Sequence, residues 1–388
     1  MGEWEMVKLG SVATVTSGGT PKKEVKEYYE NGTIPWVKTG DLKTRYIYEV
    51  EDAITERGLD NSSAKIFPVG TVLLAMYGAT IGACSILKIE ASTNQACAAL
   101  LPSENFSDSY LYYYLMSIKY ELIALGVGGA QPNISGTIIK NIKIPLPPLP
   151  VQQQIADVLD RASALVEKRK AQIEKMDLLI KSQFIEMFGD PVMNPMGWEE
   201  KELSGLGSWG SGGTPPRSEK HYFKGDINWY SAGELNEFIL HGSIEKISLE
   251  AINNTSAKLF PANSLFVGMY DTAAFKLSIT PISASSNQAC ANITPDTDLI
   301  NVYWLYYSLQ IMRPFFMQRR RGIRQKNLNL GMIKSFIIPL PPLALQNEFA
   351  TLVEQVETQK SLLQQSLAKL ALNYKSLMQK CFRGEIFK

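Results

Sequence analysis

Ser17-Gly18-Gly19-Thr20-Pro21 returns as Ser211-Gly212-Gly213-Thr214-Pro215, 194 residues later, and this repetition indicates how the chain is organised. Three further motifs return in the same order at offsets of 193 or 194 residues: 63–68 as 256–261, 94–98 as 287–291, and 144–149 as 338–343. A register that holds along the whole chain indicates a tandem duplication, with a period far too long for a solenoid. The protein therefore presents two similar surfaces, an organisation suited to binding two places on one ligand.

Length and composition indicate a globular protein of two domains or slightly more. The chain has 388 residues, of which 45% are hydrophobic, so each half can bury its own core. No apolar run approaches the roughly 20 residues needed to span a bilayer. Residues 1–9 also lack the apolar core of a signal peptide. We therefore expect a cytoplasmic protein without a membrane partner.

The cysteines and histidines argue against several kinds of catalytic site. None of the four cysteines belongs to a CxxC pair, and Cys97 and Cys290 occupy the same repeat position within apolar runs. We predict that these two are small buried side chains rather than catalytic thiols. The two histidines, His221 and His241, have no counterparts in the first half, which argues against a histidine metal site or a histidine-dependent nucleophile. Without a P-loop or a methyltransferase motif, the chain is predicted to be non-catalytic and free of metal.

Each half is predicted to form a domain of mixed strands and helices, followed by a long helix. Strands are expected at 34–37, 70–77 and 96–101, and a helix at 109–125, so each domain should be of the α+β class. The proline-rich segments 145–150 and 339–342 cannot continue a helix. They are predicted to be stiff extended connectors rather than peptide ligands for another domain.

Apolar residues recur at alternating steps of three and four over 151–188 and again over 345–377, the heptad pattern of a coiled coil. The first of these helices would be about 57 Å long. Antiparallel pairing would give a pseudo-two-fold molecule and bring residues 383–388 close to residues 1–4. The predicted parts are domain 1–147, helix 148–190, domain 191–341 and helix 342–388.

Charge is distributed unevenly along the chain. The net charge of +1 is not that of a generic nucleic-acid binder. However, no acidic residue lies between Asp298 and Glu348. A local positive field of this kind suits a phosphate backbone. The basic residues of this stretch are Arg313, Arg319, Arg320, Arg321, Arg324, Lys326 and Lys334.

The two glycine turns, at 17–21 and 211–215, allow two interpretations. Glycine lets a backbone approach a phosphate closely, with amide groups directed at it. Alternatively, each is a tight turn leading into a strand, and flanking basic side chains contact the phosphate. The second interpretation is favoured, and the flanking residues are Lys22 and Lys23 in one copy and Arg217 and Lys220 in the other.

Two aligned loops, 128–133 and 322–327, carry side chains that can read bases. Glutamine and asparagine can contact adenine with two hydrogen bonds, and arginine can contact guanine in the same way. The alternative is a polar loop in which Asn133 or Asn327 caps the following segment. The predicted contacts are Gln131, Asn133, Arg324, Gln325 and Lys326.

Discrimination between sequences is expected where the two copies differ. Segment 78–82 is replaced by 271–276, and segments 38–39 and 43–45 by 231–232 and 236–238. The half-sites that the two copies read should therefore differ as well. The aromatic residues Trp36, Trp229, Tyr77 and Tyr270 are predicted to lie in the core rather than in a groove. The candidate DNA contacts in the differing segments are Lys38, Lys43, Arg45, Thr80 and Lys276.

In both copies the order of motifs resembles the specificity subunits of Type I restriction-modification systems. The series is Trp-x-x-x-x-Leu (4–9 and 198–203), Ser-Gly-Gly-Thr-Pro, a Trp followed by Gly-Asp-Leu or Gly-Glu-Leu, Asn-Gln-Ala-Cys, and Ile-Pro-Leu-Pro-Pro-Leu before a long helix. One motif alone is weak, but the full series occurs twice and covers essentially the whole chain. One departure is that the second helix begins with 345–349 where the first has Gln-Gln-Ile-Ala at 153–156, so the partner contacts of the two helices are expected to differ slightly.

The resemblance implies two target-recognition domains, each reading one half of a bipartite, asymmetric site in double-stranded DNA. It also implies that the two helices bind two modification subunits, which methylate adenine with S-adenosylmethionine. Restriction subunits, which use ATP and Mg²⁺, would add DNA cleavage. Two other interpretations stay open on the residues alone: a coiled-coil scaffold with twin protein-binding domains, and a stand-alone nuclease with divergent metal ligands.

Overall fold

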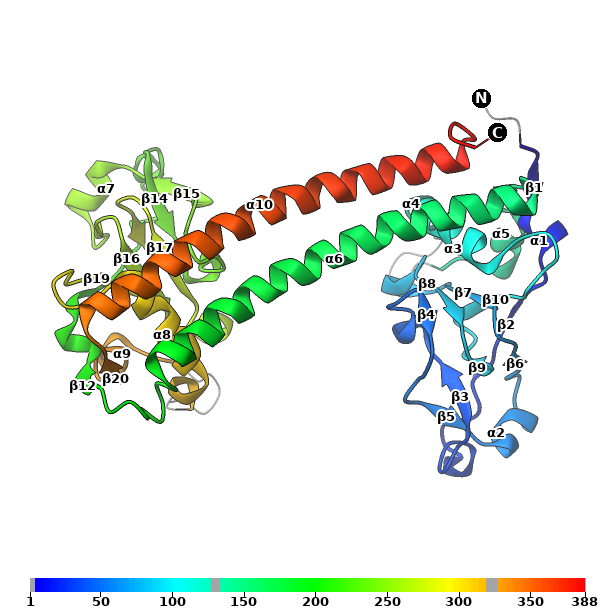
Figure 1. The fold of residues 1–388 in the computed structure, drawn as a ribbon, viewed down its shortest axis with the longest axis horizontal. Helices are drawn as coiled ribbons and strands as arrows, with labels where there is room; N and C mark the ends of the chain where they lie inside the picture. The colour runs from blue at the N-terminus through cyan, green and yellow to red at the C-terminus, as the bar shows by residue number, and fades with distance from the viewer. Residues whose placement is uncertain (1–3, 127–132, 319–326, 388) are drawn as a thin grey trace. The chain divides into compact units, whose positions relative to one another are not determined.

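The structure is a computed structural model that describes residues 4–126, 133–318 and 327–387. The chain divides into two compact units (Figure 1). Unit 1 comprises residues 1–170 and 365–388, and unit 2 comprises residues 171–364. Each unit therefore contains one mixed domain and one segment of each of the two long helices.

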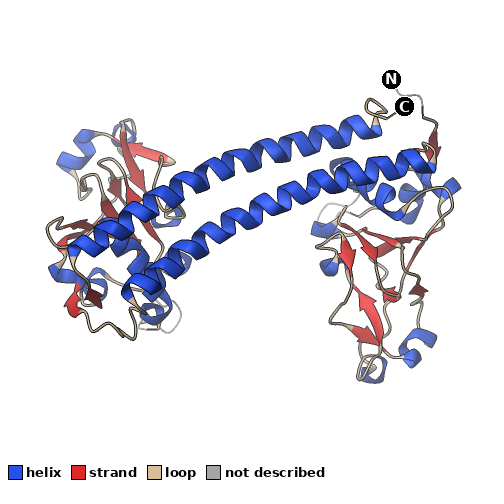
Figure 2. Ribbon diagram, viewed as in Figure 1, coloured by secondary structure: helices blue, strands red, loops and turns tan. Residues whose placement is uncertain are grey.

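Unit 1 is built on two main sheets (Figure 2). Strands β10 and β7 lie at the centre of the five-stranded sheet and are buried throughout, which explains their unbroken apolar sequences. A separate two-stranded sheet, β1 (Met6–Lys8) with β11 (Lys143–Pro145), joins the start of the domain to its end. The five-stranded sheet has the order β2 (Val15–Ser17), β10 (Cys97–Leu100), β7 (Val72–Ala75), β8 (Cys84–Leu87) and β4 (Tyr46–Ile47), and the four-stranded sheet has the order β5 (Ala53–Ile54), β3 (Ile34–Val37), β9 (Ala91–Thr93) and β6 (Ile66–Phe67).

Unit 2 repeats this strand order with two strands fewer, because isolated bridges between residues 239 and 279 and between 260 and 284 stand where unit 1 has β4 and β6. The pair β12 (Glu199–Glu202) with β20 (Ile337–Leu340) again joins the two ends of the domain. The four-stranded sheet has the order β13 (Gly207–Ser211), β19 (Cys290–Pro295), β16 (Ser264–Gly268) and β17 (Leu277–Thr280), and the three-stranded sheet has the order β15 (Glu245–Ile247), β14 (Ile227–Tyr230) and β18 (Ser285–Ser286).

The duplication extends to strand register. Strand β3 pairs in parallel with β9, with Trp36 opposite Ser92. Strand β14 pairs in parallel with β18, with Trp229 opposite Ser285. The predicted strands at 34–37, 70–77 and 96–101 are confirmed as β3, β7 and β10, and the α+β class is confirmed for both domains.

The helices of the two domains differ in one respect. In unit 2, the expected helix is continuous as α8 (Val302–Met317). In unit 1, the single helix expected over 109–125 is instead two helices, α3 (Asp108–Ser117) and α4 (Lys119–Ala124), which meet at Ile118. Ile118 has ψ of 15°, outside the helical range, so the backbone changes direction there. The remaining domain helices are α1 (Leu9–Val12), α2 (Glu56–Asp60), α5 (Gly136–Asn141), α7 (Leu249–Asn254) and α9 (Leu330–Lys334).

The two long helices are α6 (Leu149–Phe188) and α10 (Leu343–Phe382), each of 40 residues. The prediction that the first connector stays extended to residue 150 is wrong, because Pro150 lies in the first turn of α6. The first turn tolerates proline because the N–H that proline lacks has no helical partner at that position. Helix α10 begins directly after Pro342, as expected.

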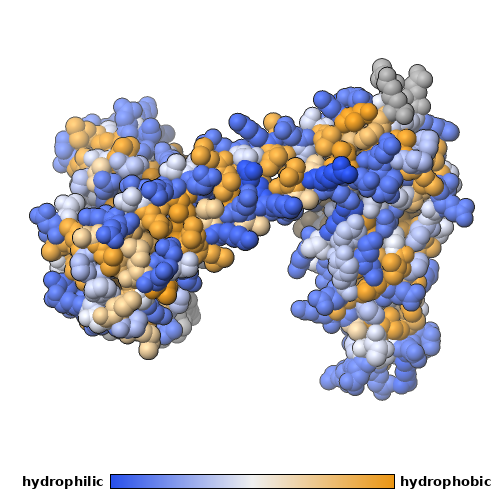
Figure 3. Space-filling model, viewed as in Figure 1, coloured by the Kyte–Doolittle hydropathy of each residue, from blue (hydrophilic) through white to orange (hydrophobic). Residues whose placement is uncertain are grey.

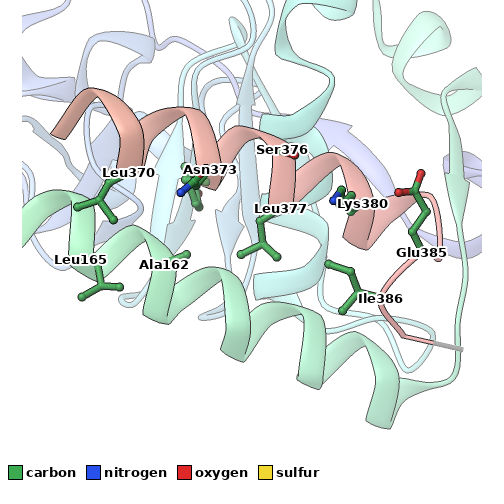
Figure 4. A pocket seen from close by; sticks show the side chains of 10 residues that line it. Ala162, Leu165, Leu370, Asn373, Ser376, Leu377, Lys380, Glu385 and Ile386 are labelled. Atoms are coloured by element: carbon green, nitrogen blue, oxygen red, sulfur yellow. The ribbon is translucent and has the colours of Figure 1, made fainter. Parts of the chain in front are cut away.

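Within each unit the segments of α6 and α10 run antiparallel. In unit 1, Ile155 and Leu159 share a core with Met378 and Cys381. Further along α6, Leu165 lies with Leu370 and Leu377 around a groove of about 560 Å³ (Figure 4). Residue numbers on α10 therefore fall as those on α6 rise.

The pairing in unit 2 has the same sense. Asp177 Oδ1 lies 2.5 Å from Lys360 Nζ, and the Phe184 and Phe188 rings lie 5.4 and 5.5 Å from the Phe349 ring. The predicted antiparallel pairing of the two helices is thus confirmed inside each unit. The heptad side chains of α10 are buried or half-buried, but Leu165 and Leu179 on α6 are exposed.

A buried glutamine attaches each long helix to its own domain. Gln152 Oε1 accepts the backbone N–H of Ser107 at 3.1 Å, and its Nε2 donates to two backbone carbonyls at 2.9 Å. Gln346 makes the same three kinds of bond, with the Asn301 N–H at 2.9 Å and two carbonyls at 3.3 and 2.8 Å. The structure therefore aligns Gln152 with Gln346, so the departure noted from the sequence does not extend to this attachment.

The ends of the described chain lie together, as predicted. Trp4 and Phe387 both pack against the hydrophobic core of unit 1, together with Phe382 at the end of α10. Phe382 contacts Tyr110 and Tyr114 on α3, with ring centroids 5.4 and 5.3 Å apart. The last residues of the chain therefore complete the core of the first domain.

Candidate nucleic-acid interface

Three of the repeated motifs meet at one place in unit 1. A Cβ added to Gly18 would lie 2.0 Å from the carbonyl oxygen of Thr93, and one added to Gly19 would lie 2.3 Å from Ser63. Only glycine leaves room for this approach. The Gly19 N–H also donates to the Thr93 carbonyl at 2.9 Å. The glycine turn is thus packed against the end of β9 and against the motif at 63–68.

Unit 2 repeats this convergence. A Cβ on Gly212 would lie 2.2 Å from the Ser286 carbonyl oxygen, and one on Gly213 would lie 2.2 Å from that of Ser256. The Gly213 N–H donates to the Ser286 carbonyl at 2.9 Å. All four glycines are buried, which supports a structural role, but they follow β2 and β13 instead of leading into a strand.

A tryptophan holds each turn from the core side. Trp36 Nε1 donates to the Gly19 carbonyl at 3.1 Å, and Trp229 Nε1 donates to the Gly213 carbonyl at 2.9 Å. Both tryptophans are buried, so their prediction as core residues is confirmed. A buried indole N–H needs an acceptor, and the turn supplies one in each copy.

The same prediction is wrong for the tyrosines. Tyr77 is 44% exposed and Tyr270 is 38% exposed. Each lies two residues after the end of a buried strand and directly before a 3₁₀ turn, η3 (Gly78–Thr80) or η7 (Asp271–Ala273), so the chain leaves the sheet there. The aromatic residue that ends the apolar run therefore faces solvent.

Backbone hydrogen bonds place several exposed side chains side by side in unit 1. The Met76 N–H donates to the Ala96 carbonyl at 2.9 Å, and the Ile134 N–H donates to the Met76 carbonyl at 2.9 Å. Residue 77 also forms an isolated β-bridge with residue 133. The exposed side chains gathered at this edge are Tyr77, Gln95 and Asn133.

The corresponding edge of unit 2 is connected in the same way. The Met269 N–H donates to the Ala289 carbonyl at 2.9 Å, and the Leu328 N–H donates to the Met269 carbonyl at 2.8 Å. The exposed side chains of this edge include Tyr270 and Gln288. In both units, the residues that follow the predicted base-contacting loop therefore lie beside the exposed tyrosine.

The N-cap positions of the helices that follow the two loops are occupied by residues other than Asn133 and Asn327. Helix α5 is capped by Ser135, whose hydroxyl accepts the Ile138 N–H at 3.2 Å. Helix α9 is capped by Asn329, whose side chain accepts the Met332 N–H at 2.9 Å. Asn133 is exposed and does not cap the helix that follows it.

Arg45, one of the predicted DNA contacts, is engaged inside unit 1. Its Nη1 makes an ion pair with Asp160 on α6, and its side chain is only 17% exposed. The guanidinium carbon lies 4.7 Å from the Tyr46 ring centroid and 4.6 Å from that of Tyr113. Burial tends to lower the pKa of this group, but the hydrogen bond to Asp160 and the nearby acidic groups raise it overall. Arg45 therefore attaches the domain to the long helix.

Unit 2 has a different side chain at this position, and it packs against α8 of its own domain. Phe238 occupies the repeat position of Arg45, and its ring lies 5.2, 4.7 and 5.4 Å from those of Tyr303, Tyr306 and Tyr307. The difference between the copies at this position thus reflects packing against a helix.

Several other predicted contacts lie on the surface, some with partners inside the chain. Lys38 Nζ lies 2.5 Å from Asp52. Arg217 makes two hydrogen bonds to Glu245, at 2.5 and 2.8 Å, which lower the pKa of that carboxyl group. Lys276 Nζ donates to Asn236 Oδ1 at 2.6 Å, which joins two of the segments that differ between the copies. Thr80 is half-buried, and Lys22, Lys23, Lys43 and Lys220 are exposed.

The densest group of predicted contacts falls outside the described residues. Its members are Gln131, Arg319, Arg320, Arg321, Arg324, Gln325 and Lys326. Their role stays a prediction from the sequence.

Sequence reasoning missed a matched set of polar residues within the repeated motifs. The hydroxyl of Thr20 donates to Gln95 Oε1, and that of Thr214 donates to Gln288 Oε1. Two exposed lysines, Lys65 and Lys258, also recur beside the glycine turns. The signal was available, because all six residues lie in motifs that occur in both halves.

The cysteines are buried, as predicted for Cys97 and Cys290. Burial raises the pKa of each of these thiols to about 12, and that of Cys381 to about 11. Burial also raises the pKa of the Cys84 thiol. None of the four is thus a thiolate near neutral pH.

Residues 4–126, 133–318 and 327–387 hold neither a metal-binding cluster nor a membrane span. No group of three or more His, Cys, Asp or Glu side chains there has the arrangement needed to hold a metal ion. No helix in the same ranges combines the length and the apolar character needed to cross a membrane.

Comparison with known proteins gives a consistent result. A protein-family model described as "Type I restriction modification DNA specificity domain" matches residues 1–175 and 195–372. The MjaIX specificity subunit of Methanocaldococcus jannaschii is 28% identical over 378 residues, which cover 91% of this chain and 86% of that protein. The EcoR124I/EcoR124II specificity subunit of Escherichia coli is 31% identical over 169 residues, 42% of each protein.

Two solved structures share the fold. The S subunit of a Type I restriction-modification system from M. genitalium has a TM-score of 0.58 at 16% identity, covering 98% of this chain and 96% of that one. A chain from a structural study of complex assembly and conformational transition of the type I R-M system has a TM-score of 0.66 at 18% identity, covering 99% and 98%. With the family model matching both halves of the duplicated sequence, the chain belongs to the Type I restriction-modification DNA specificity family.

Proposed function

We propose that this protein is the non-catalytic specificity subunit of a Type I restriction-modification complex. Each domain binds one half of a bipartite DNA site. The observation that carries the proposal is that each half matches a DNA specificity domain, and each half exposes an edge built from the same motifs. Because the segments 78–82 and 271–276 differ beside that edge, the two half-sites differ in sequence.

DNA binding rests on local rather than overall charge. The net charge is only +1, so the basic residues must be concentrated on the binding face. Lys22, Lys23 and Lys220 flank the glycine turns and are exposed. The arginines at 319–324 precede Leu328 in the sequence, and Leu328 is hydrogen-bonded to Met269, the neighbour of Tyr270. These groups contact phosphates and orient each domain, while the polar side chains of the edge face the bases.

The long helices bind the partner subunits. Apolar side chains reach the surface among charged ones along α6 and α10 (Figure 3). Leu178, Leu362 and Leu372 are 64%, 55% and 68% exposed, more than a helix facing only water needs. The partners are two methyltransferase subunits, which use S-adenosylmethionine to methylate adenine, and restriction subunits, which use ATP and Mg²⁺. The complex works in the cytoplasm.

Mapping of methylated adenines across a genome tests this function. Cells that carry the methyltransferase subunit are compared with and without this chain. The expected result is one bipartite motif that is methylated only when the chain is present. Methylation that is unchanged by its removal would contradict the proposal.

Two binding experiments separate the other functional classes. Salt-sensitive binding of duplex DNA by the complex is expected for a specificity subunit, whereas a protein-binding scaffold gives no DNA-dependent signal. Metal-dependent cleavage by the isolated chain would instead indicate a nuclease.

A further inference from the structure

The same hydrogen-bonded pair of side chains occurs at the exposed edge of both units. In unit 1 the Thr20 hydroxyl donates to the side-chain oxygen of Gln95, and in unit 2 the Thr214 hydroxyl donates to that of Gln288. Both glutamines are exposed. Among the described residues, no hydrogen-bond partner is found for either Nε2. Each glutamine therefore presents free donors to solvent from an oriented side chain.

The backbone under each glutamine is fixed. In unit 1, the turn between β9 and β10 is closed by Asn94, whose side chain accepts the Ala96 N–H at 3.2 Å and whose carbonyl accepts the Cys97 N–H at 3.2 Å. The Asn94 N–H donates to the Val37 carbonyl at 3.0 Å, which ties the turn to β3.

The turn of unit 2 is fixed in the same way. Asn287 accepts the Ala289 N–H at 3.1 Å through its side chain and the Cys290 N–H at 3.1 Å through its carbonyl. Side chains on such rigid supports lose little conformational freedom when they bind.

The threonine is held by the glycine turn that precedes it. Gly18 and Gly19 are packed so closely against Thr93 and Ser63 that no side chain fits at either position. This packing delivers the next residue, Thr20, to Gln95. The joint repetition of Ser-Gly-Gly-Thr-Pro and Asn-Gln-Ala-Cys is thus explained, because one motif supplies the threonine and the other supplies the glutamine of the hydrogen-bonded pair.

The chemistry of the pair selects one base. In both units the threonine hydroxyl donates to the carboxamide oxygen, and it uses one of the two lone pairs of that oxygen. One acceptor site and the adjacent amide donors remain. In the major groove, adenine presents an acceptor at N7 beside a donor at N6, which this arrangement matches. Guanine presents two acceptors, so its O6 would face the glutamine oxygen.

We propose that Gln95 and Gln288 each read one adenine, at corresponding positions of the two half-sites, and that Thr20 and Thr214 position them. The inference rests on the proposed function, since it assigns residues to that DNA-binding edge. The two half-sites then share one adenine and differ at the positions read by the segments that differ between the copies.

Atomic substitution in the DNA tests the pair. Each adenine of the mapped site is replaced in turn by 7-deazaadenine, which lacks the N7 acceptor, and binding by the complex with methyltransferase subunits is measured. With the parent protein, the affinity is expected to fall roughly tenfold at one position in each half-site. Gln95→Ala abolishes this sensitivity in one half-site only, and Gln288→Ala abolishes it in the other only.

The matched controls keep the test specific. Asn253→Ala, at an exposed position on α7, leaves both sensitive positions unchanged. Thr20→Val keeps the volume but removes the hydroxyl, so it reduces the preference for adenine over guanine at the first position without abolishing binding. Thermal unfolding of each variant complex establishes that the exposed substitutions leave the fold intact.

The outcomes distinguish two failures. If the parent complex neither binds nor methylates a bipartite site, the proposed function is wrong. If it does both, but Gln95→Ala and Gln288→Ala leave the pattern of 7-deazaadenine sensitivity unchanged, only the adenine-reading role is overturned. A mapped site without an adenine at corresponding positions of its half-sites would overturn it as well.

Discussion

Arg45 and Asp160 form an ion pair that joins the first domain to helix α6, with the guanidinium enclosed by the rings of Tyr46, Tyr112 and Tyr113. The Nε and Nη2 atoms of Arg45 are buried without a hydrogen-bond partner in the described structure, so aromatic faces replace part of the water that these atoms lose. Arg45 was predicted from the sequence to contact DNA, but in the structure it joins the first domain to helix α6.

Replacement of Arg45 should affect stability rather than DNA binding. Arg45→Met removes the ion pair and the cation between the rings, at a cost of about 2 kcal/mol in the free energy of unfolding of unit 1. Lys43→Met, at an exposed position two residues away, should change it by less than about 0.5 kcal/mol. Thermal denaturation measures both values. A smaller salt dependence of DNA binding in the Arg45 variant would show instead that this side chain contacts phosphate.

The buried glutamines at the start of the long helices should be sensitive to substitution. Gln152→Leu or Gln346→Leu leaves one backbone N–H and two carbonyls without their partners, which should cost about 2–3 kcal/mol. Gln153→Leu, at the exposed neighbouring position, should cost less than about 0.5 kcal/mol. Chemical denaturation compares the three variants. Equal midpoints for Gln152→Leu and Gln153→Leu would rule out the attachment role.

The glycine turns should not tolerate a methyl group. Gly18→Ala places a Cβ 2.0 Å from the Thr93 carbonyl oxygen, so the turn must shift, at about 1–3 kcal/mol. We expect weaker methylation at sites that require the first domain. Gly40→Ala serves as the control, because its Cβ meets no atom within 4 Å. Methylation by the Gly18 variant at the parental level would contradict the close packing.

The arginine-rich segment should contribute to phosphate binding. Replacement of Arg320, Arg321 and Arg324 with Ala should weaken binding of all duplexes and reduce the salt slope by about 0.9 for each phosphate that is no longer neutralised. The slope is measured from dissociation constants of the complex over a range of salt concentrations. Identical slopes for variant and parent would exclude phosphate binding by these residues.

Thiol ionisation should make the folded protein less stable at alkaline pH. The pKa of Cys97 and of Cys290 is raised to about 12, whereas unfolded cysteines ionise near pH 8.5. The unfolded state therefore loses protons first, so the contribution of these thiols is full below about pH 8.5 and declines as pH rises towards 12. A thiol reagent at pH 8 should label the protein only after denaturant is added. Rapid labelling of the native chain would show that a thiol is accessible.

The duplication, the α+β class of the domains and the long helices could be predicted from the sequence alone, because they depend on periodic and local signals. The offsets of 193 and 194 residues, the heptad steps and the prolines before each helix are all visible without knowledge of the tertiary structure. Buried strands such as β7 and β10 were also predictable, since a strand covered on both faces is apolar throughout.

The contacts of individual side chains became visible only in the folded structure, because they depend on neighbours far away in the chain. Arg45 meets Asp160 across 115 residues, and Thr20 meets Gln95 across 75, separations at which composition and spacing carry no information about proximity. Tyr77 follows an apolar run yet faces solvent, because the chain leaves the sheet at that residue. Local patterns specify the elements, whereas the packing of those elements specifies which polar groups remain free to bind.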